Sequence, residues 1–127
     1  MLPRAARLRS GREFRATYSR SQSYSTPRLV LYLRSGRTVP TAESTAKTGE
    51  IRLGFSISKK AARRAHERNL VKRRLREIVR LNVLGRVRPG RFDAVIVARS
   101  PSVEAGFKQL AEDIEHLFTK AGALEVI

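Results

Sequence analysis

The sequence predicts a single α+β domain, a two-layer α/β sandwich in which helices pack on a small sheet. The chain has 127 residues, which is most economically one domain and is long enough to bury a core. Segments with a helical apolar period are interspersed with short segments rich in β-branched and aromatic residues. Their order is α-β-β(-β)-α-β-α, and such a mixture is typical of helices that cover a sheet.

Residues 10–20 predict a short first helix. Ser10 can cap its N-terminus, and Glu13 follows three residues later, as in a capping box. Phe14 and Tyr18 form an aromatic pair one helical turn apart. A pair at this spacing more often belongs to a core than to a binding surface, although two neighbouring arginines favour binding. Both interpretations stay open at this point.

Three segments predict strands. Residues 28–34 and 50–58 alternate in the way that suits a sheet with one exposed face. Gly54 leaves one face of the later of these strands open to a ligand or to another backbone. Residues 92–99 are the most hydrophobic and suit a strand that is buried on both faces. Residues 35–49 predict a polar, mobile loop, within which a further strand could lie.

Residues 66–80 predict an amphipathic helix with one face for a core and the other for a polyanion. At about 100° per residue, its apolar side chains share one face. The opposite side carries Asn69, Lys72, Arg73, Arg76 and Arg80. Only Arg74 falls among the apolar positions, where its long stem could carry the charge outward.

A last helix is predicted to start at residues 100–102, where two serines flank a proline. Its apolar stripe consists of Phe107, Leu110, Ala111, Ile114, Leu117 and Phe118. We expect residues 1–127 to form one domain and residues 1–9 to be disordered.

The charge of the chain indicates a polyanionic partner. The chain carries 27 Lys and Arg against 11 Asp and Glu, a net charge of +16. Residues 59–91 hold 13 basic and two acidic residues, whereas residues 102–127 hold two basic and five acidic ones. A solvated basic face is the usual origin of a charge run, but the size and clustering of this excess favour nucleic acid. Arginine outnumbers lysine, which suits RNA because a guanidinium binds two phosphate oxygens and stacks on bases.

Other features of the composition narrow the class of protein. The chain has no cysteine, so it has neither disulfides nor thiolate metal sites. No apolar run approaches the ~20 residues of a membrane span. The N-terminus lacks the apolar run of about 7 or more residues that a signal peptide needs. We therefore expect a cytoplasmic protein with no membrane partner.

No group of residues predicts catalysis by this chain alone. His66 and His116 have no second ligand at metal spacing. The carboxylates Glu67, Glu77 and Asp93 are far apart in the sequence, whereas a nuclease that holds Mg²⁺ itself usually needs converging carboxylates. The chain therefore predicts an RNA-binding subunit, with its basic groups on phosphates and its aromatic rings against unpaired nucleotides.

The central segment also resembles a known family. It reads Ser58-Lys59-Lys60, seven further residues, and then Arg68-Asn69-x-x-Lys72-Arg73-x-x-Arg76-Glu77. This pattern is similar to the signature of the bacterial ribonuclease P protein component. The other predicted elements agree in order and spacing, so that the resemblance covers about residues 7–120.

The resemblance implies an α/β sandwich with an unusual left-handed β-α-β crossover at the signature helix. It further implies a non-catalytic subunit of the endoribonuclease ribonuclease P. In that enzyme a large RNA removes the 5′ leader of precursor tRNA with Mg²⁺, and no metal would be held by the protein alone. The expected partners are one catalytic RNA and precursor tRNA, without DNA.

Two surfaces follow from this resemblance. The signature helix would face the catalytic RNA and help to order metal near the cleavage site. Its expected RNA-subunit-binding residues are Arg63, Arg64, Arg68, Asn69, Lys72, Arg73, Arg76 and Arg80. A cleft between the first helix and the sheet would hold the single-stranded leader. The expected leader-binding residues are Arg12, Phe14, Arg15, Tyr18, Tyr32, Ser56, Lys59 and Lys60.

One position departs from the pattern of the family. The family commonly has Arg-Asn-Arg where this chain has Arg68-Asn69-Leu70, and Arg63, Arg64 and Arg74 could compensate.

Three other functions are alternatives. A ribosomal or other structural RNA-binding protein would share the charge but would not need an aromatic cleft. A nuclease that acts alone would need the missing carboxylate cluster, and a DNA-binding module would need helix-turn-helix spacing.

Overall fold

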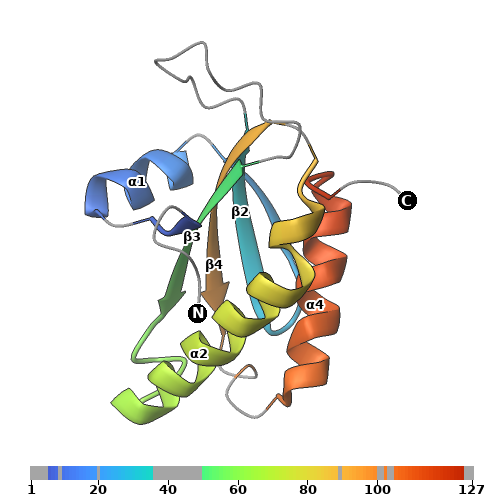
Figure 1. Cartoon of the computed structure of the whole chain (residues 1–127). Coiled ribbons are helices and arrows are strands. Elements are labelled where there is room, and N and C mark those ends of the chain that lie inside the picture. The colour runs from blue at the N-terminus through green and yellow to red at the C-terminus, as the bar shows by residue number, and fades with distance from the viewer. Residues whose placement is uncertain are drawn as a thin grey trace.

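The computed structural model of the protein describes residues 6–8, 10–19, 21–35, 50–88, 90–99, 102 and 105–124. These residues form three helices, one 3₁₀ turn and a sheet of four strands, an α+β fold as predicted (Figure 1). The elements are α1 (Gly11–Ser19), β1 (Gln22–Ser25), β2 (Leu29–Ser35), β3 (Glu50–Ile57), α2 (Ala65–Asn82), η2 (Leu84–Arg86), β4 (Arg91–Ala98) and α4 (Phe107–Lys120).

The strands lie in the order β1-β2-β4-β3. β2 pairs antiparallel with both β1 and β4, whereas β3 pairs parallel with β4. β4 therefore has a neighbour on each side, and six of its eight residues are buried. The prediction of a strand buried on both faces is confirmed for β4, which explains its nearly continuous apolar sequence.

The chain passes from β3 to β4 through α2. In Figure 1, α2 lies in front of the sheet, both strands point downward, and β4 lies to the right of β3. A right-handed connection viewed in this way would bring the later strand to the left. The crossover is therefore left-handed, against the usual rule and in agreement with the resemblance described above.

Helices α2 and α4 cover one face of the sheet and form the core with it (Figure 1). α2 contributes Val71, Leu75, Ile78 and Val79, and α4 contributes Leu110, Ile114, Leu117 and Phe118, all of them fully buried. The predicted apolar faces of both helices are confirmed for these residues. Phe107 is the exception, because it begins α4 and is 42% exposed.

The short helix α1 packs against the opposite face of the sheet. Its predicted capping box is present, because the Ser10 N–H donates to Glu13 Oε1 at 3.1 Å and the Glu13 N–H donates to Ser10 Oγ at 3.1 Å. The next residue, Phe14, lies on Gly54 of β3, where a Cβ atom would overlap the Phe14 ring. The open face of Gly54 thus receives a side chain of α1, rather than the ligand or backbone that the sequence suggested.

Some boundaries differ from the sequence prediction. Residues 22–25 form an edge strand that the sequence did not predict, because a mostly exposed strand with one neighbour shows no apolar alternation. The possible strand within residues 35–49 lies outside the described residues. Residues 6–8, predicted to be disordered, pack on the free edge of β3, where the Leu8 N–H donates to the Leu53 carbonyl at 2.8 Å. Residues 1–5 and 9 lie outside the described residues.

The last helix begins later than predicted, at Phe107 rather than at residues 100–102. Ser102 is helical and fully buried, and its hydroxyl donates to the Arg99 carbonyl at 2.6 Å, so it does not cap α4. The α4 N-terminus is instead closed by the Gly106 N–H, which donates to Gln109 Oε1 at 3.3 Å. Among the helices that the structure describes, none combines the length and apolar character needed to cross a bilayer.

Gly54→Ala is expected to destabilise the protein. The added methyl group would displace the Phe14 ring and with it α1, so the free energy of unfolding should fall by about 1–3 kcal/mol. Gly85→Ala is the matched control, because a Cβ atom there meets nothing within 4 Å. Urea unfolding of both variants checks this expectation. Equal stability of the two would show that Phe14 can leave Gly54 without cost.

Candidate nucleic-acid interface

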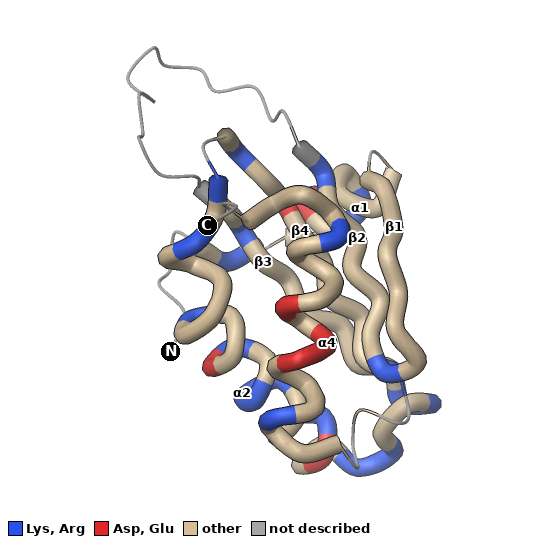
Figure 2. The backbone as a smooth tube through the Cα atoms, turned by 90° about the vertical axis from the view of Figure 1, so that its right-hand side faces the viewer, with Lys and Arg blue, Asp and Glu red and all other residues tan. Residues whose placement is uncertain are grey.

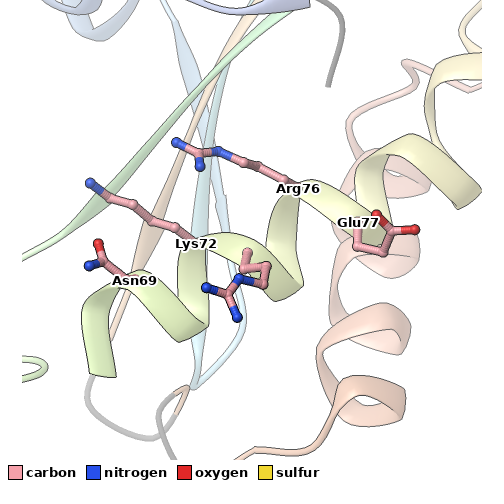
Figure 3. Close-up of a pocket in the computed structure, with 5 residues that line it drawn as sticks. Asn69, Lys72, Arg76 and Glu77 are labelled. Atoms are coloured by element: carbon pink, nitrogen blue, oxygen red, sulfur yellow. The ribbon is translucent and has the colours of Figure 1, made fainter. Parts of the chain in front are cut away.

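The outer side of α2 forms a cationic surface, which we call the α2 ridge. Since the apolar side chains of this 18-residue helix face the sheet, most of its basic residues lie on the outside. A hollow of about 520 Å³ on this side is lined by Asn69, Lys72, Arg73, Arg76 and Glu77. Figure 3 shows Asn69, Lys72 and Arg76 projecting to the same side of α2, with Glu77 set apart from them. The structure thus brings together the central four of the predicted RNA-subunit-binding residues.

At the two ends of the α2 ridge, Arg80 and Arg68 have partners within the protein. Arg80 forms an ion pair with Glu77. A hydrogen bond from Arg80 lowers the pKa of Glu77, so this carboxylate stays charged beside the cations at neutral pH. Arg63 and Arg64 are exposed in the turn before α2. This turn is held by Arg68, whose Nη1 donates to the Ala62 and Arg63 carbonyls at 2.8 Å and 3.0 Å.

The sequence suggested that the stem of Arg74 carries its charge outward into solvent, but the structure shows it bound to the protein. Its Nη1 donates to the Ala105 carbonyl at 3.0 Å, which links α2 to the segment before α4. The side chain of Leu70, one turn earlier, is 39% exposed. Of the three arginines that could compensate for this leucine, Arg63 and Arg64 are exposed, whereas Arg74 is engaged with the protein backbone.

A second surface, which we call the leader face, lies on the side of the sheet that α1 partly covers. The strand register places Gly54 of β3, Val95 of β4 and Tyr32 of β2 side by side on it. Tyr18 of α1 meets Tyr32 edge to face, with ring centroids 5.0 Å apart and an interplanar angle of 81°. Ser56 follows two residues after Gly54 and therefore shares this face.

Tyr18 is partly open to solvent, with 38% of its surface exposed. The pKa of its hydroxyl is raised, chiefly by burial, while the Ser56 side chain acts in the opposite direction. The hydroxyl is thus protonated at neutral pH and can donate a hydrogen bond. Four predicted leader-binding residues are therefore brought together: Phe14, Tyr18, Tyr32 and Ser56.

The remaining predicted leader-binding residues lie around this face. Lys59 and Lys60 are exposed in the turn after β3, which the Ala62 N–H closes on the Ser58 carbonyl at 3.0 Å. Arg12 and Arg15 are exposed on α1. Arg12 lies about 160° around the helix from Phe14 and so faces away from the sheet.

The sequence interpretation missed an ionic cluster at the start of the leader face. Arg52 of β3 forks onto Asp93 of β4, with Nε and Nη2 at 2.9 Å and 3.0 Å from the two carboxylate oxygens. Its Nη1 lies 2.5 Å from Glu13 Oε2 of α1. The hydrogen bond to Asp93 raises the pKa of Arg52. The sequence feature that could have indicated this cluster is the presence of Arg52 and Asp93 within two largely apolar strands.

Within the described ranges, no three His, Asp or Glu side chains lie close enough together to hold a metal ion. His66 and His116 are both exposed.

A basic α+β fold with a cationic helix and a separate aromatic face is typical of a class, that of small RNA-binding proteins. The model of the Ribonuclease P family matches residues 2–122. The chain belongs to the ribonuclease P protein family. Membership makes it part of an endoribonuclease complex that acts in tRNA processing and implies a ribonuclease P RNA as partner. The ribosomal alternative is thereby set aside.

Similar proteins from several bacteria carry the same description. The ribonuclease P protein component of Cyanothece sp. is 33% identical over 98% of both chains. That of Xanthomonas campestris is 36% identical over 96% of this chain and 73% of the relative, and that of Clostridium botulinum is 35% identical over 91% and 94%.

Solved structures agree with the fold. The RNase P protein of Staphylococcus aureus has a TM-score of 0.77 and 24% identity, over 96% of this chain and 100% of that chain. The RNase P protein of Thermotoga maritima has a TM-score of 0.67 and 27% identity, over 87% and 92%. The predicted family and fold class are confirmed.

Arg68→Ala is expected to loosen the turn before α2. Loss of the two bonds to the Ala62 and Arg63 carbonyls should lower the free energy of unfolding by about 1 kcal/mol. Arg73→Ala, which removes an exposed arginine from the same helix, should change it by less than about 0.5 kcal/mol. Thermal unfolding of both variants measures the difference. An equal effect of the two would contradict a structural role for Arg68.

Proposed function

We propose that the chain is the protein subunit of ribonuclease P and binds two RNA molecules on two surfaces. The α2 ridge binds the catalytic RNA, one copy per protein. The leader face binds the single-stranded 5′ leader of precursor tRNA. The protein thereby aids the Mg²⁺-dependent removal of the leader, while the RNA subunit carries out the chemistry.

The observation that carries this proposal is the half-exposed tyrosine pair of the leader face. Tyr18 and Tyr32 present ring surface beside the Ser56 hydroxyl. Unpaired bases stack on aromatic rings, whereas paired bases are hidden inside a duplex, so this surface suits a single strand. Lys59 and Lys60 lie in the turn that follows β3, where they can meet the phosphates of the same strand.

The α2 ridge suits a folded RNA for a different reason. Most of the side chains around its hollow are cationic, and they project from one helix (Figure 3). Such an array recognises the positions of phosphates rather than bases. The residues proposed to make these contacts are Arg63, Arg64, Arg68, Asn69, Lys72, Arg73, Arg76 and Arg80.

We place Mg²⁺ with the RNA subunit and the substrate. When bound, this ion stabilises the charge that develops during phosphodiester hydrolysis. The contribution of the protein is to neutralise phosphates near the site, so that the assembly needs less free Mg²⁺.

Cleavage of precursor tRNA at low Mg²⁺ tests the proposal. The assay compares the protein alone, the catalytic RNA alone and the two together. Activity only in the combination supports the subunit function. Activity of the protein alone would reveal a catalytic site in the chain, and no effect of the protein on a compatible RNA would refute the proposal.

Arg73→Ala and Arg76→Ala should raise the Mg²⁺ concentration at half-maximal cleavage, because each removes a cation from the α2 ridge. Each should also reduce the slope of log affinity for the catalytic RNA against log salt concentration by about 1. Lys108→Ala, which removes an exposed cation from α4, is the matched control and should change neither quantity. Unchanged Mg²⁺ dependence in both ridge variants would count against their proposed role.

Tyr18→Ala should weaken the binding of precursor tRNA by about tenfold, because one stacking surface is lost. The affinity for mature tRNA, which has no leader, should stay the same. Tyr18→Phe keeps the ring and serves as the control for the hydroxyl group. The measurement is the dissociation constant of the holoenzyme for each tRNA. An equal loss of affinity for both tRNAs would contradict the assignment of the leader face.

A further inference from the structure

We propose that Arg52 and Glu13 are positioning residues for the leader face. Through the buried Asp93, they fix helix α1 on the sheet and so set the place of Tyr18 opposite Tyr32. This inference rests on the proposed function, since it concerns how the leader face keeps its shape. Neither residue was among the predicted leader-binding residues.

The first step is the anchor in the sheet. Asp93 lies on the central strand β4 and is only 1% exposed. A buried carboxylate is costly unless strong donors surround it. Arg52, its direct neighbour in the parallel pair, supplies two parallel N–H bonds of 2.9 Å and 3.0 Å. A fork of this kind fixes direction as well as distance, so the Arg52 guanidinium is held in one orientation.

The second step is the link from the sheet to α1. The remaining terminal nitrogen of Arg52, Nη1, lies 2.5 Å from Glu13 Oε2. The other oxygen of Glu13 accepts the Ser10 N–H at 3.1 Å and closes the capping box. One carboxylate therefore both starts the helix and binds it to the sheet. The first turn of α1 is attached at a point that the buried pair determines.

The third step leads from the first turn to the ligand surface. α1 has nine residues, which is too short for an isolated helix to be stable, so tertiary contacts must fix it. Phe14 on Gly54 and the buried Thr17 hold the helix against the sheet. The link through Glu13 adds a directional contact one turn before Tyr18. Without it, α1 can rotate or slide about the Phe14 contact, and Tyr18 shifts away from Tyr32.

A direct role of Arg52 as a cation for the leader is the competing explanation, because its side chain is 27% exposed. The two explanations predict opposite changes in leader binding when the charge of Glu13 is removed. If Arg52 attracts the leader directly, removal of the negative charge of Glu13 strengthens leader binding. If Arg52 acts by positioning α1, the same change weakens it. Glu13→Gln is the suitable variant, because glutamine preserves the capping box and leaves the Arg52–Asp93 pair in place.

The experiment measures how strongly the holoenzyme prefers precursor tRNA over mature tRNA, as the ratio of the two dissociation constants. Glu13→Gln and Arg52→Gln should each reduce this preference by about three- to tenfold, with the affinity for the catalytic RNA unchanged. Arg52→Lys should not rescue it, because an ammonium group cannot fork onto Asp93. Hydrogen exchange of the α1 amides in the free protein should be faster in Glu13→Gln than in the unsubstituted chain.

Arg28→Gln is the matched control. Arg28 forms an ion pair with Asp113 of α4 at 3.0 Å, and its side chain is 30% exposed, close to the 27% of Arg52. Breaking this pair disturbs the opposite face of the sheet and should leave the preference for precursor tRNA unchanged. An equal loss in this variant would mean that general destabilisation, rather than positioning, explains the effect.

The outcomes separate this inference from the proposed function. A higher preference for precursor tRNA in Glu13→Gln would overturn positioning in favour of direct attraction. An unchanged preference in Glu13→Gln and Arg52→Gln, together with a loss in Tyr18→Ala, would refute the inference and keep the leader face. An unchanged preference in all three variants would refute both.

Discussion

β3 and β4 run parallel as neighbours, and this pairing determines where the chain between them must lie. The chain leaves β3 at one end of the sheet and has to return to the other end before β4 begins. An eight-residue strand is about 26 Å long, and the 18 residues of α2 span about 27 Å, so one helix makes the return. α2 must then lie along the sheet with its apolar side inward, which leaves its cations outside.

The same constraint makes the two candidate surfaces neighbours along the chain. β3 carries Ser56 on the leader face, and α2 begins only a short turn after the end of that strand. Arg68 reaches back from α2 to the carbonyls of this turn, so the turn is held by the helix that follows it. A displacement of the α2 ridge would therefore reach Lys59 and Lys60 through a few covalent and hydrogen bonds, without passing through the core.

Much of the fold follows from local patterns, because the apolar faces of α2 and α4 and the nearly continuous apolar sequence of β4 are visible in the sequence and form the core. β1 escaped prediction because its four residues are polar and pair on one side only. The α2 ridge could be predicted, since residues three and four apart on a helix are neighbours wherever the helix lies. The ionic cluster could not, because Arg52 and Asp93 are 41 residues apart and meet only through the strand order.

The charge on α4 gives the molecule an electrical polarity. α2 carries six basic and two acidic residues, whereas α4 carries Glu112, Asp113 and Glu115 against two lysines (Figure 2). In the field of a polyanion, this uneven distribution produces a torque that turns α2 toward the polyanion and α4 away from it. At physiological ionic strength the field decays over about 8 Å, so the torque acts only in the last moments of approach. Orientation is then selected during the encounter, before any contact has formed.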